Sequence, residues 1–156
     1  MKAHVYVTPK RTVLDPQGEI AITNDDTAPT LSIGDVNLAE GNAGPTAFEF
    51  TVTQSAVSGL STTVDFATAN GTATAPSDYG AVTGSVTIPA GSTTGTAPVT
   101  VAGDSIVEPD ETFFGNLSNA VNATIADGQG IGTIVNDDAE PNEPPVANAG
   151  PDQSVF

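Results

Sequence analysis

The sequence contains no cysteine and only one histidine, His4. Disulfides and thiolate metal sites are therefore impossible, and the residues for a Ser-His-Asp or Cys-His nucleophile system or a histidine zinc site are missing. Tryptophan is absent and only two tyrosines are present, so nothing marks the kind of cleft in which paired carboxylates cleave a sugar. We therefore expect a protein that is not an enzyme.

Long apolar runs and positive charge are also scarce. No stretch of about 18 apolar residues exists, so we expect no direct insertion into a membrane. Three Lys and Arg residues stand against 19 Asp and Glu, which gives a formal net charge of -16. All three cations, Lys2, Lys10 and Arg11, lie near the start of the chain. Because such an acidic surface repels nucleic-acid phosphates, we exclude nucleic acid as a partner.

The abundant residues are those of β-structure and turns: 22 Thr and 16 Val, with 16 Gly and 12 Pro. Short alternating runs occupy residues 31–33, 48–52, 64–66, 86–88, 99–101, 113–117 and 131–135. Turn signals such as Asn70-Gly71 and Asp127-Gly128 separate several of these runs. The pattern predicts an all-β fold, a seven-stranded, immunoglobulin-like antiparallel β-sandwich.

An internal repeat indicates how the chain is organised. Residues 15–26 match residues 127–138 at a constant offset of 112 (127 minus 15), so the last strand of one module occurs twice. We interpret residues 13–26 as the tail of a preceding module and residues 27–138 as a complete one. Residues 1–12 are then an artefact of the gene start or a truncated strand, and residues 139–156 begin as a Pro-rich linker.

The acidic residues are unevenly placed in this predicted sandwich. If consecutive strands run in opposite directions, the loops after the first, third, fifth and seventh strands emerge at one end. The acids in those loops are Glu40, Asp78, Asp104, Glu108, Asp110, Glu111, Asp137, Asp138, Glu140 and Glu143. The loops at the other end, within residues 54–61, 89–95 and 119–130, contain only Asp127.

So many acids at one end repel one another, and no Lys or Arg is available to offset them. We expect a metal cation there. Carboxylates, carbonyls and water are hard donors that suit Ca²⁺, whereas Mg²⁺ needs a near-ideal octahedron and softer metals need nitrogen or sulfur ligands. The alternative is a solvated acidic rim with no specific site.

Four segments give the sequence a family resemblance. They are Val64-Asp-Phe-Ala-Thr-Ala-Asn-Gly71 with Asp78-Tyr79, Gly84-Ser-Val-Thr-Ile-Pro89, Asp104-Ser-Ile-Val-Glu108-Pro-Asp110-Glu111, and Gly132-Thr-Ile-Val-Asn136-Asp137-Asp138. Together they closely resemble the Calx-beta motif over about residues 30–138. The resemblance implies a calcium-binding β-sandwich of the kind found in sodium/calcium exchangers, an integrin tail and bacterial surface proteins.

The resemblance also implies which residues hold calcium. The matching positions are Glu40, Asp78, Asp104, Glu108, Asn136, Asp137 and Asp138. Two positions depart from the richest sites: Gly103 stands where an acid can precede Asp104, and Asn136 replaces the first acid of the terminal triplet. Fewer negative ligands imply fewer ions or weaker binding.

The C-terminal segment has a resemblance of its own. Pro144-Pro-Val-Ala-Asn-Ala-Gly-Pro-Asp152 is similar to the opening of a polycystic-kidney-disease-type (PKD) domain, another extracellular sandwich. The neighbouring Calx-beta and PKD-like domains of the same chain are therefore expected partners, together with calcium ions. A cell-surface protein or a polysaccharide is a further expected partner.

These observations lead to an expected function. The chain is expected to be a non-catalytic calcium-binding module of a large multidomain secreted or cell-surface protein, in which Ca²⁺ stiffens interdomain junctions for adhesion or surface architecture. Residues 1–11 lack the apolar stretch of a signal peptide. Two alternatives stay open: a calcium-sensing regulatory module, and an accessory binding module of a secreted hydrolase.

Overall fold

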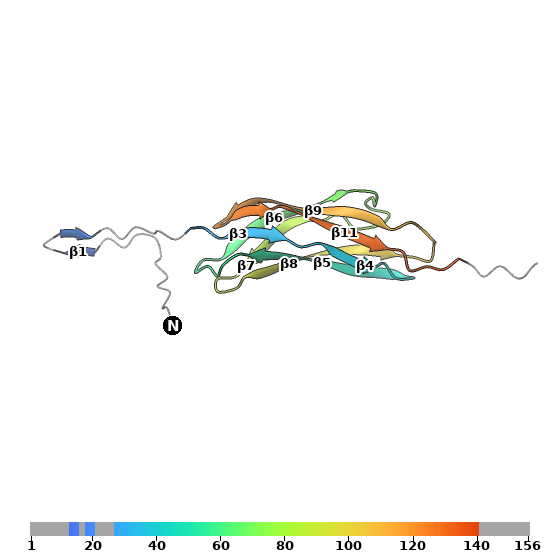
Figure 1. Cartoon of the computed structure of the whole chain (residues 1–156), viewed down its shortest axis with the longest axis horizontal. Coiled ribbons are helices and arrows are strands. Elements are labelled where there is room, and N and C mark those ends of the chain that lie inside the picture. The colour runs from blue at the N-terminus through green and yellow to red at the C-terminus, as the bar shows by residue number, and fades with distance from the viewer. Residues whose placement is uncertain (1–12, 16–17, 21–26, 141–156) are drawn as a thin grey trace, which may run out of the picture.

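The computed structural model describes residues 13–15, 18–20 and 27–140, and every regular element in these ranges is a strand. Nine of the strands form two sheets packed face to face (Figure 1). The predicted all-β, immunoglobulin-like sandwich is therefore confirmed. Because the described part of the chain contains no helix, it also contains none that could cross a membrane.

The two sheets contain four and five strands. The smaller sheet has the order β10 (Thr124–Asp127), β3 (Thr30–Ile33), β5 (Gly44–Gln54) and β8 (Thr94–Gly103). The larger sheet has the order β4 (Val36–Ala39), β11 (Gln129–Val135), β9 (Glu111–Val121), β6 (Thr62–Asn70) and β7 (Thr83–Ile88).

Alternating burial fills the space between the sheets. On β5 every second residue from Phe48 to Gln54 is buried, and β8 alternates in the same way. Phe113 is completely buried and packs edge-on against Phe50, with ring centroids 5.7 Å apart, whereas its neighbour Phe114 is only partly buried. Each buried aromatic ring contributes roughly 1.5–3 kcal/mol through loss of contact with water.

All seven predicted runs lie inside observed strands, but β4 and β10 were not predicted. Both are short edge strands of four residues without alternating burial. Each pairs in parallel, β4 with β11 and β10 with β3, so the sandwich is not purely antiparallel. The change of sheet after β3 occurs at Gly34-Asp35, where the carboxylate of Asp35 accepts a hydrogen bond of 2.8 Å from the N–H of Ile131.

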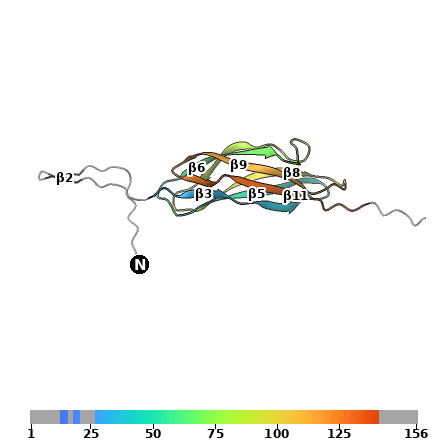
Figure 2. The same ribbon diagram turned by 45° about the horizontal axis from the view of Figure 1, so that its top comes forward.

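The strand directions place the loops as predicted. β3 and β4 run the same way (Figure 1). Antiparallel pairing then fixes the directions of β5 and β8 in one sheet and of β6, β7, β9 and β11 in the other. The ends of β4, β6, β8 and β11 therefore share one end of the sandwich. The chain enters β3 at the opposite end (Figure 2).

Two further strands precede the sandwich. β1 (Val13–Asp15) and β2 (Gly18–Ile20) pair antiparallel, with Val13 opposite Ile20. At the repeat offset these strands correspond to parts of β10 and β11, which lie in different sheets of the complete module. The interpretations of residues 1–12 and of the PKD-like segment concern parts of the chain outside the described residues.

Candidate metal centre

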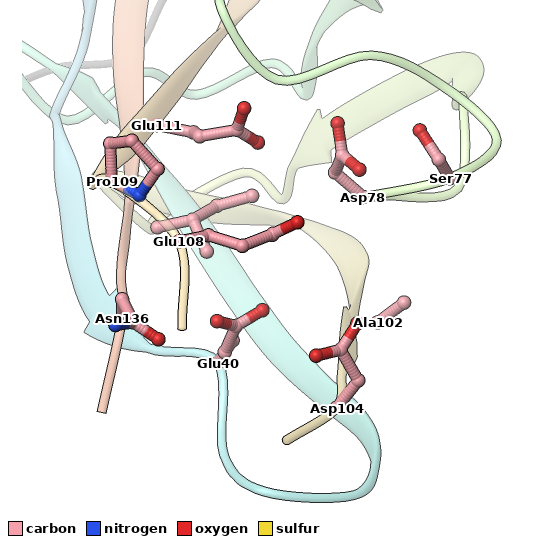
Figure 3. A pocket seen from close by; sticks show the side chains of 10 residues that line it. Glu40, Ser77, Asp78, Ala102, Asp104, Glu108, Pro109, Glu111 and Asn136 are labelled. Carbon is pink, nitrogen blue, oxygen red and sulfur yellow. The ribbon is translucent and has the colours of Figure 1, made fainter. Parts of the chain in front are cut away.

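A narrow pocket lies at the end of the sandwich where β4, β8 and β11 finish and β9 begins (Figure 3). Its cavity volume is about 20 Å³, which is room for roughly one water-sized occupant. Most of its polar lining is carboxylate. The lining residues are Glu40, Ser77, Asp78, Ala102, Asp104, Glu108, Pro109, Glu111, Ile134 and Asn136.

Glu40 is the most buried acid of this group. It follows β4, where its N–H donates to the carbonyl of Val135 at 3.2 Å and its own carbonyl accepts a hydrogen bond from the Thr46 hydroxyl. Only 6% of the residue is exposed. Burial raises the pKa of Glu40, and the negative charges of Asp104, Asp138, Glu108 and Asp137 raise it further. The fold thus holds a carboxylate where its charge is poorly solvated and repelled.

Asp78 and Glu111 form a coupled pair on the other side of the pocket (Figure 3). Burial raises the pKa of Asp78, but hydrogen bonds from the Thr74 N–H, at 2.7 Å, and from side chains outweigh it, so the net pKa of Asp78 is lowered. Burial raises the pKa of Glu111, and the charges of Asp78 and Glu108 add to this effect. The pKa values of these two neighbouring carboxyl groups are therefore shifted in opposite directions, down for Asp78 and up for Glu111.

Asp78 is placed by the residue that follows it. Tyr79 is buried, its ring stacks on Phe113 at 4.4 Å, and its hydroxyl donates to the side-chain oxygen of Asn70 at 2.7 Å. The backbone of residues 78–80 also bonds to β8, since the N–H of Ala102 donates to the carbonyl of Asp78 at 2.9 Å. The stacking of Tyr79 on Phe113 in the core and the hydrogen bond to β8 together hold this loop beside the pocket.

The loop after β8 supplies two more acids. Asp104 accepts a hydrogen bond of 2.7 Å from the N–H of Ile106, which forms a local turn at the start of the loop. Its carboxylate and that of Glu108 face Glu40 (Figure 3). Asp110 instead accepts a hydrogen bond of 3.1 Å from the N–H of Asn136 and so ties this loop to the end of β11.

Gly103 explains one departure from the richest sites. A Cβ atom added there would lie 2.2 Å from the carbonyl oxygen of Gly41 and 2.6 Å from that of Glu40. The two backbone segments therefore approach more closely than any side chain at position 103 allows. An acidic side chain at position 103 would therefore collide with the backbone of residues 40 and 41.

The terminal triplet is divided in its contacts. Asn136 lines the pocket, while its side-chain oxygen accepts a hydrogen bond of 3.2 Å from the N–H of Asp138. Asp137 accepts from the N–H of Gly41 at 3.1 Å, and Asp138 accepts from the side-chain amide of Asn42 at 2.7 Å. These two acids therefore hold the turn after β4 rather than lining the pocket.

Five of the seven predicted site residues are thus brought together in one pocket: Glu40, Asp78, Asp104, Glu108 and Asn136. Asp137 and Asp138 lie close enough to Glu40 to raise its pKa, but on the side of the Gly41-Asn42 turn. Glu111 and Ser77 were missing from the predicted set. Strand direction had already placed Glu111 at this end, whereas a lone serine gives no sequence signal.

The donors suit a hard cation. No Lys, Arg or His occurs within residues 27–140, so no side-chain cation offsets the acids there. The Oδ2 atom of Asp138 is buried and has no hydrogen-bond partner among the described residues. However, no three carboxylates of the described chain are already arranged to hold a metal ion. The acids converge on the pocket without forming a closed coordination shell.

Comparison with known families identifies the family of this chain. The model of the family described as the Calx-beta domain matches residues 22–138. The chain belongs to the Calx-beta family. This Calx-beta chain has no significant match among curated proteins.

Several solved structures share the Calx-beta fold. The apo form of the Calx CBD1 domain is 22% identical with a TM-score of 0.60, over 72% of this chain and 100% of that one. CBD12 from CALX1.2 is 23% identical with a TM-score of 0.62, over 70% of this chain and 44% of that one. The structure described as the calcium binding domain CBD12 of CALX1.1 is also 23% identical with a TM-score of 0.62, over 69% and 46%.

Proposed function

We propose that this Calx-beta chain is a non-catalytic calcium-binding module of a large secreted or cell-surface protein. The observation that carries the proposal is the pocket itself, in which carboxylates from three separate segments converge with the side chain of Asn136, and residues 27–140 contain no Lys, Arg or His to offset them. Membership of the Calx-beta family supports it, and so does similarity to a structure described as a calcium binding domain. Glu40, Asp78, Asp104, Glu108, Glu111 and the side-chain oxygen of Asn136 are the donors that we assign to Ca²⁺.

The chemistry of the donors favours calcium over other metals. Ca²⁺ accepts six to eight oxygen ligands in variable geometry, and water can complete a site that the protein only partly encloses. Bound calcium would supply positive charge to the end of the sandwich where burial and repulsion now raise the pKa of Glu40 and Glu111. Asp137 and Asp138 are assigned a second role, because their carboxylates lie near Glu40 but bind the Gly41-Asn42 turn.

The architectural role rests on the repeat. The tail of a preceding module ends at Asn24-Asp25-Asp26, which matches Asn136-Asp137-Asp138, and only Thr27-Ala28-Pro29 separates it from this module. Calcium at each acidic end would then lie at a junction and stiffen a chain of successive domains. Adhesion or surface architecture, with a PKD-like domain following, is the setting that we infer for such a chain.

A calcium-sensing module is the second candidate, and two contacts favour it. The hydrogen bonds from Gly41 and Asn42 to Asp137 and Asp138 join two loops through carboxylates that a cation would also attract. Calcium binding would then exchange these contacts and move the turn. Comparison of the amide chemical shifts of Gly41 and Asn42 with and without calcium separates a responsive turn from a rigid one.

Calorimetric titration of the 156-residue protein tests the proposal. We expect the native chain to release or absorb heat on binding Ca²⁺, and Asp104→Asn to weaken the binding at least about tenfold, because it removes one negative ligand. Asp127→Asn makes the same change outside the pocket, at the crossover from β10 to β11, and should leave binding unchanged. Absence of calcium binding in the native chain, or equal effects of the two substitutions, would contradict the proposed site.

A further inference from the structure

Exposed apolar side chains gather at the end of the sandwich opposite the acidic pocket. Val57 is 47% exposed, Leu60 48% and Val121 55%. Val57 and Leu60 lie in the loop between β5 and β6, and Val121 ends β9. We call this end of the sandwich, which carries the three side chains, the apolar end.

Two contacts hold these segments side by side. The side-chain amide of Asn122 donates to the carbonyl of Ser61 at 2.8 Å, and Val121 is opposite Thr63 in the pairing of β9 with β6. The loop after β5 is fixed in turn, because the N–H of Gly91 donates to the carbonyl of Ser58 at 2.9 Å. The apolar end is therefore a defined surface.

The chain enters the sandwich between the same two segments. The carbonyl of Pro29 accepts a hydrogen bond of 2.9 Å from Thr124, directly after the turn that carries Val121. Thr30 and Ser55 exchange two hydrogen bonds of 2.9 Å at the start of the loop that carries Val57. Whatever precedes Pro29 must therefore begin next to the apolar end.

The sequence repeat identifies what precedes it. Asp26 corresponds to Asp138, which follows the last strand of a module at its acidic end. The three intervening residues, Thr27-Ala28-Pro29, span at most about 10 Å when extended. The acidic end of a preceding module would thus lie within that distance of the residues that flank the apolar end.

The two ends are compatible in charge and in polarity. The connections at this end, residues 55–61, 89–93 and 122–123, carry no acid, so an acidic partner meets little repulsion there. The acidic end of this module also exposes apolar side chains, with Ile106 59% and Val107 40% exposed in the loop after β8. A preceding module of the same kind would offer similar groups to its successor.

We propose that Val57, Leu60 and Val121 form a docking surface for the acidic end of the preceding Calx-beta module of the same chain. The proposal relies on the proposed function for the existence of that module and for its acidic end. The contact itself is apolar, so it differs physically from stiffening by calcium. Each junction then has two sources of rigidity, burial of these side chains and a cation in the neighbouring pocket.

A tandem protein tests the docking surface. A copy of residues 27–138 replaces residues 1–26, so that Asn136-Asp137-Asp138 stands where Asn24-Asp25-Asp26 now stands. Because the chain has no cysteine, one Ser85→Cys substitution in each copy provides two specific spin-label positions on exposed parts of β7. Electron paramagnetic resonance then gives the distribution of distances between the two modules, with calcium and with chelator.

Substitution of Val57, Leu60 and Val121 by Ser in the second copy should broaden this distribution about twofold or more, since modules without a shared apolar contact move independently. The matched control is Leu38→Ser with Ile131→Ser, which removes side chains that are 43% and 40% exposed on β4 and β11. We expect this control to leave the distribution unchanged. The thermal midpoint of unfolding is measured for each variant to establish that it remains folded. The three single substitutions are measured in the same way, in case the triple variant does not fold.

The outcomes separate the two proposals. A distribution that the triple substitution leaves unchanged overturns the docking surface, whatever chelation does. Broadening by the triple substitution but not by chelation supports docking and contradicts stiffening by calcium. Broadening by both supports both proposals, whereas broadening by the control pair as well overturns the specific role of the apolar end.

Discussion

At the scale of single residues, the acidic end combines groups that the sequence places together and one glycine that only the packing explains. Glu40, Asp78, Asp104 and Glu108 could be assigned to one end because strand direction alone sorts the loops. The role of Gly103 could not be predicted, because it depends on how closely β8 approaches the carbonyls of Glu40 and Gly41. Close backbone contacts leave no pattern in a single sequence.

Substitution of Gly103 tests that contact. Gly103→Ala should destabilise the protein by about 1–3 kcal/mol, because its Cβ atom must displace two backbone carbonyls. Gly84→Ala is the control: nothing lies within 4 Å of the added atom, and we expect little change in stability. Chemical denaturation of both variants gives the free energies of unfolding. Equal stabilities would mean that the loop after β4 moves aside freely.

The two glutamates with raised pKa values predict how the calcium-free protein responds to pH. Because the folded state binds their protons more tightly than the unfolded state, stability should rise as the pH falls from neutral toward their ordinary value of 4.5. The pKa of Asp78 is lowered, so its contribution is present above 3.8 and is lost as the pH falls below that value. We expect maximum stability at mildly acidic pH in the presence of chelator.

Thermal midpoints between pH 7 and pH 3 check this expectation. Glu40→Gln should reduce the rise in midpoint between pH 7 and pH 5, since its side chain no longer titrates. Glu49→Gln removes the same charge from an exposed position on β5 and serves as the control for general loss of repulsion. A midpoint that falls steadily from pH 7 would be inconsistent with the raised pKa values.

At the scale of elements, the predictable strands are those with one face in the core. The alternation of β5, β8 and β9 is visible in the sequence because each strand buries every second residue over much of its length. β4 and β10 were missed because short edge strands bury too few side chains to show a period of two. Their parallel pairing depends on strands remote in sequence, which local pattern cannot reveal.

The strand directions were nevertheless predicted correctly, although β4 and β10 were missed. Each missed strand continues the direction of a predicted neighbour, so the alternation between ends was unaffected. The placement of Asp127 was wrong, because this residue ends β10 opposite Ser32 of β3, where the chain crosses to the other sheet, and not in a loop at the end. Side-chain orientation was less predictable: Asp137 and Asp138 reach the correct end but contact the Gly41-Asn42 turn. The last residues of a chain segment can turn either way once the sheet no longer constrains them.

At the scale of the whole molecule, charge is the feature that the proposed calcium site must account for. A net charge of -16 disfavours the compact state by self-repulsion, and any salt relieves part of that through screening. Specific binding of calcium differs from this screening in the size of the stabilisation and in its selectivity for one ion. A cation that binds only the folded state, at a free concentration a hundred times its dissociation constant, adds about 2.7 kcal/mol to the free energy of unfolding. This raises the melting temperature by roughly 10 °C for a domain of this size.

Melting curves in matched salts therefore distinguish a calcium site from a solvated acidic rim. We expect millimolar Ca²⁺ to raise the melting temperature of the 156-residue protein relative to chelator, and NaCl of equal ionic strength to raise it much less. Mg²⁺ should have an intermediate or small effect, because it gives up its own water less readily than Ca²⁺ does. If NaCl reproduces the calcium shift, screening alone explains the acidic end and the pocket holds no specific ion. A calcium shift that Asp104→Asn abolishes and Asp127→Asn preserves would instead tie the stability of the whole sandwich to this one pocket.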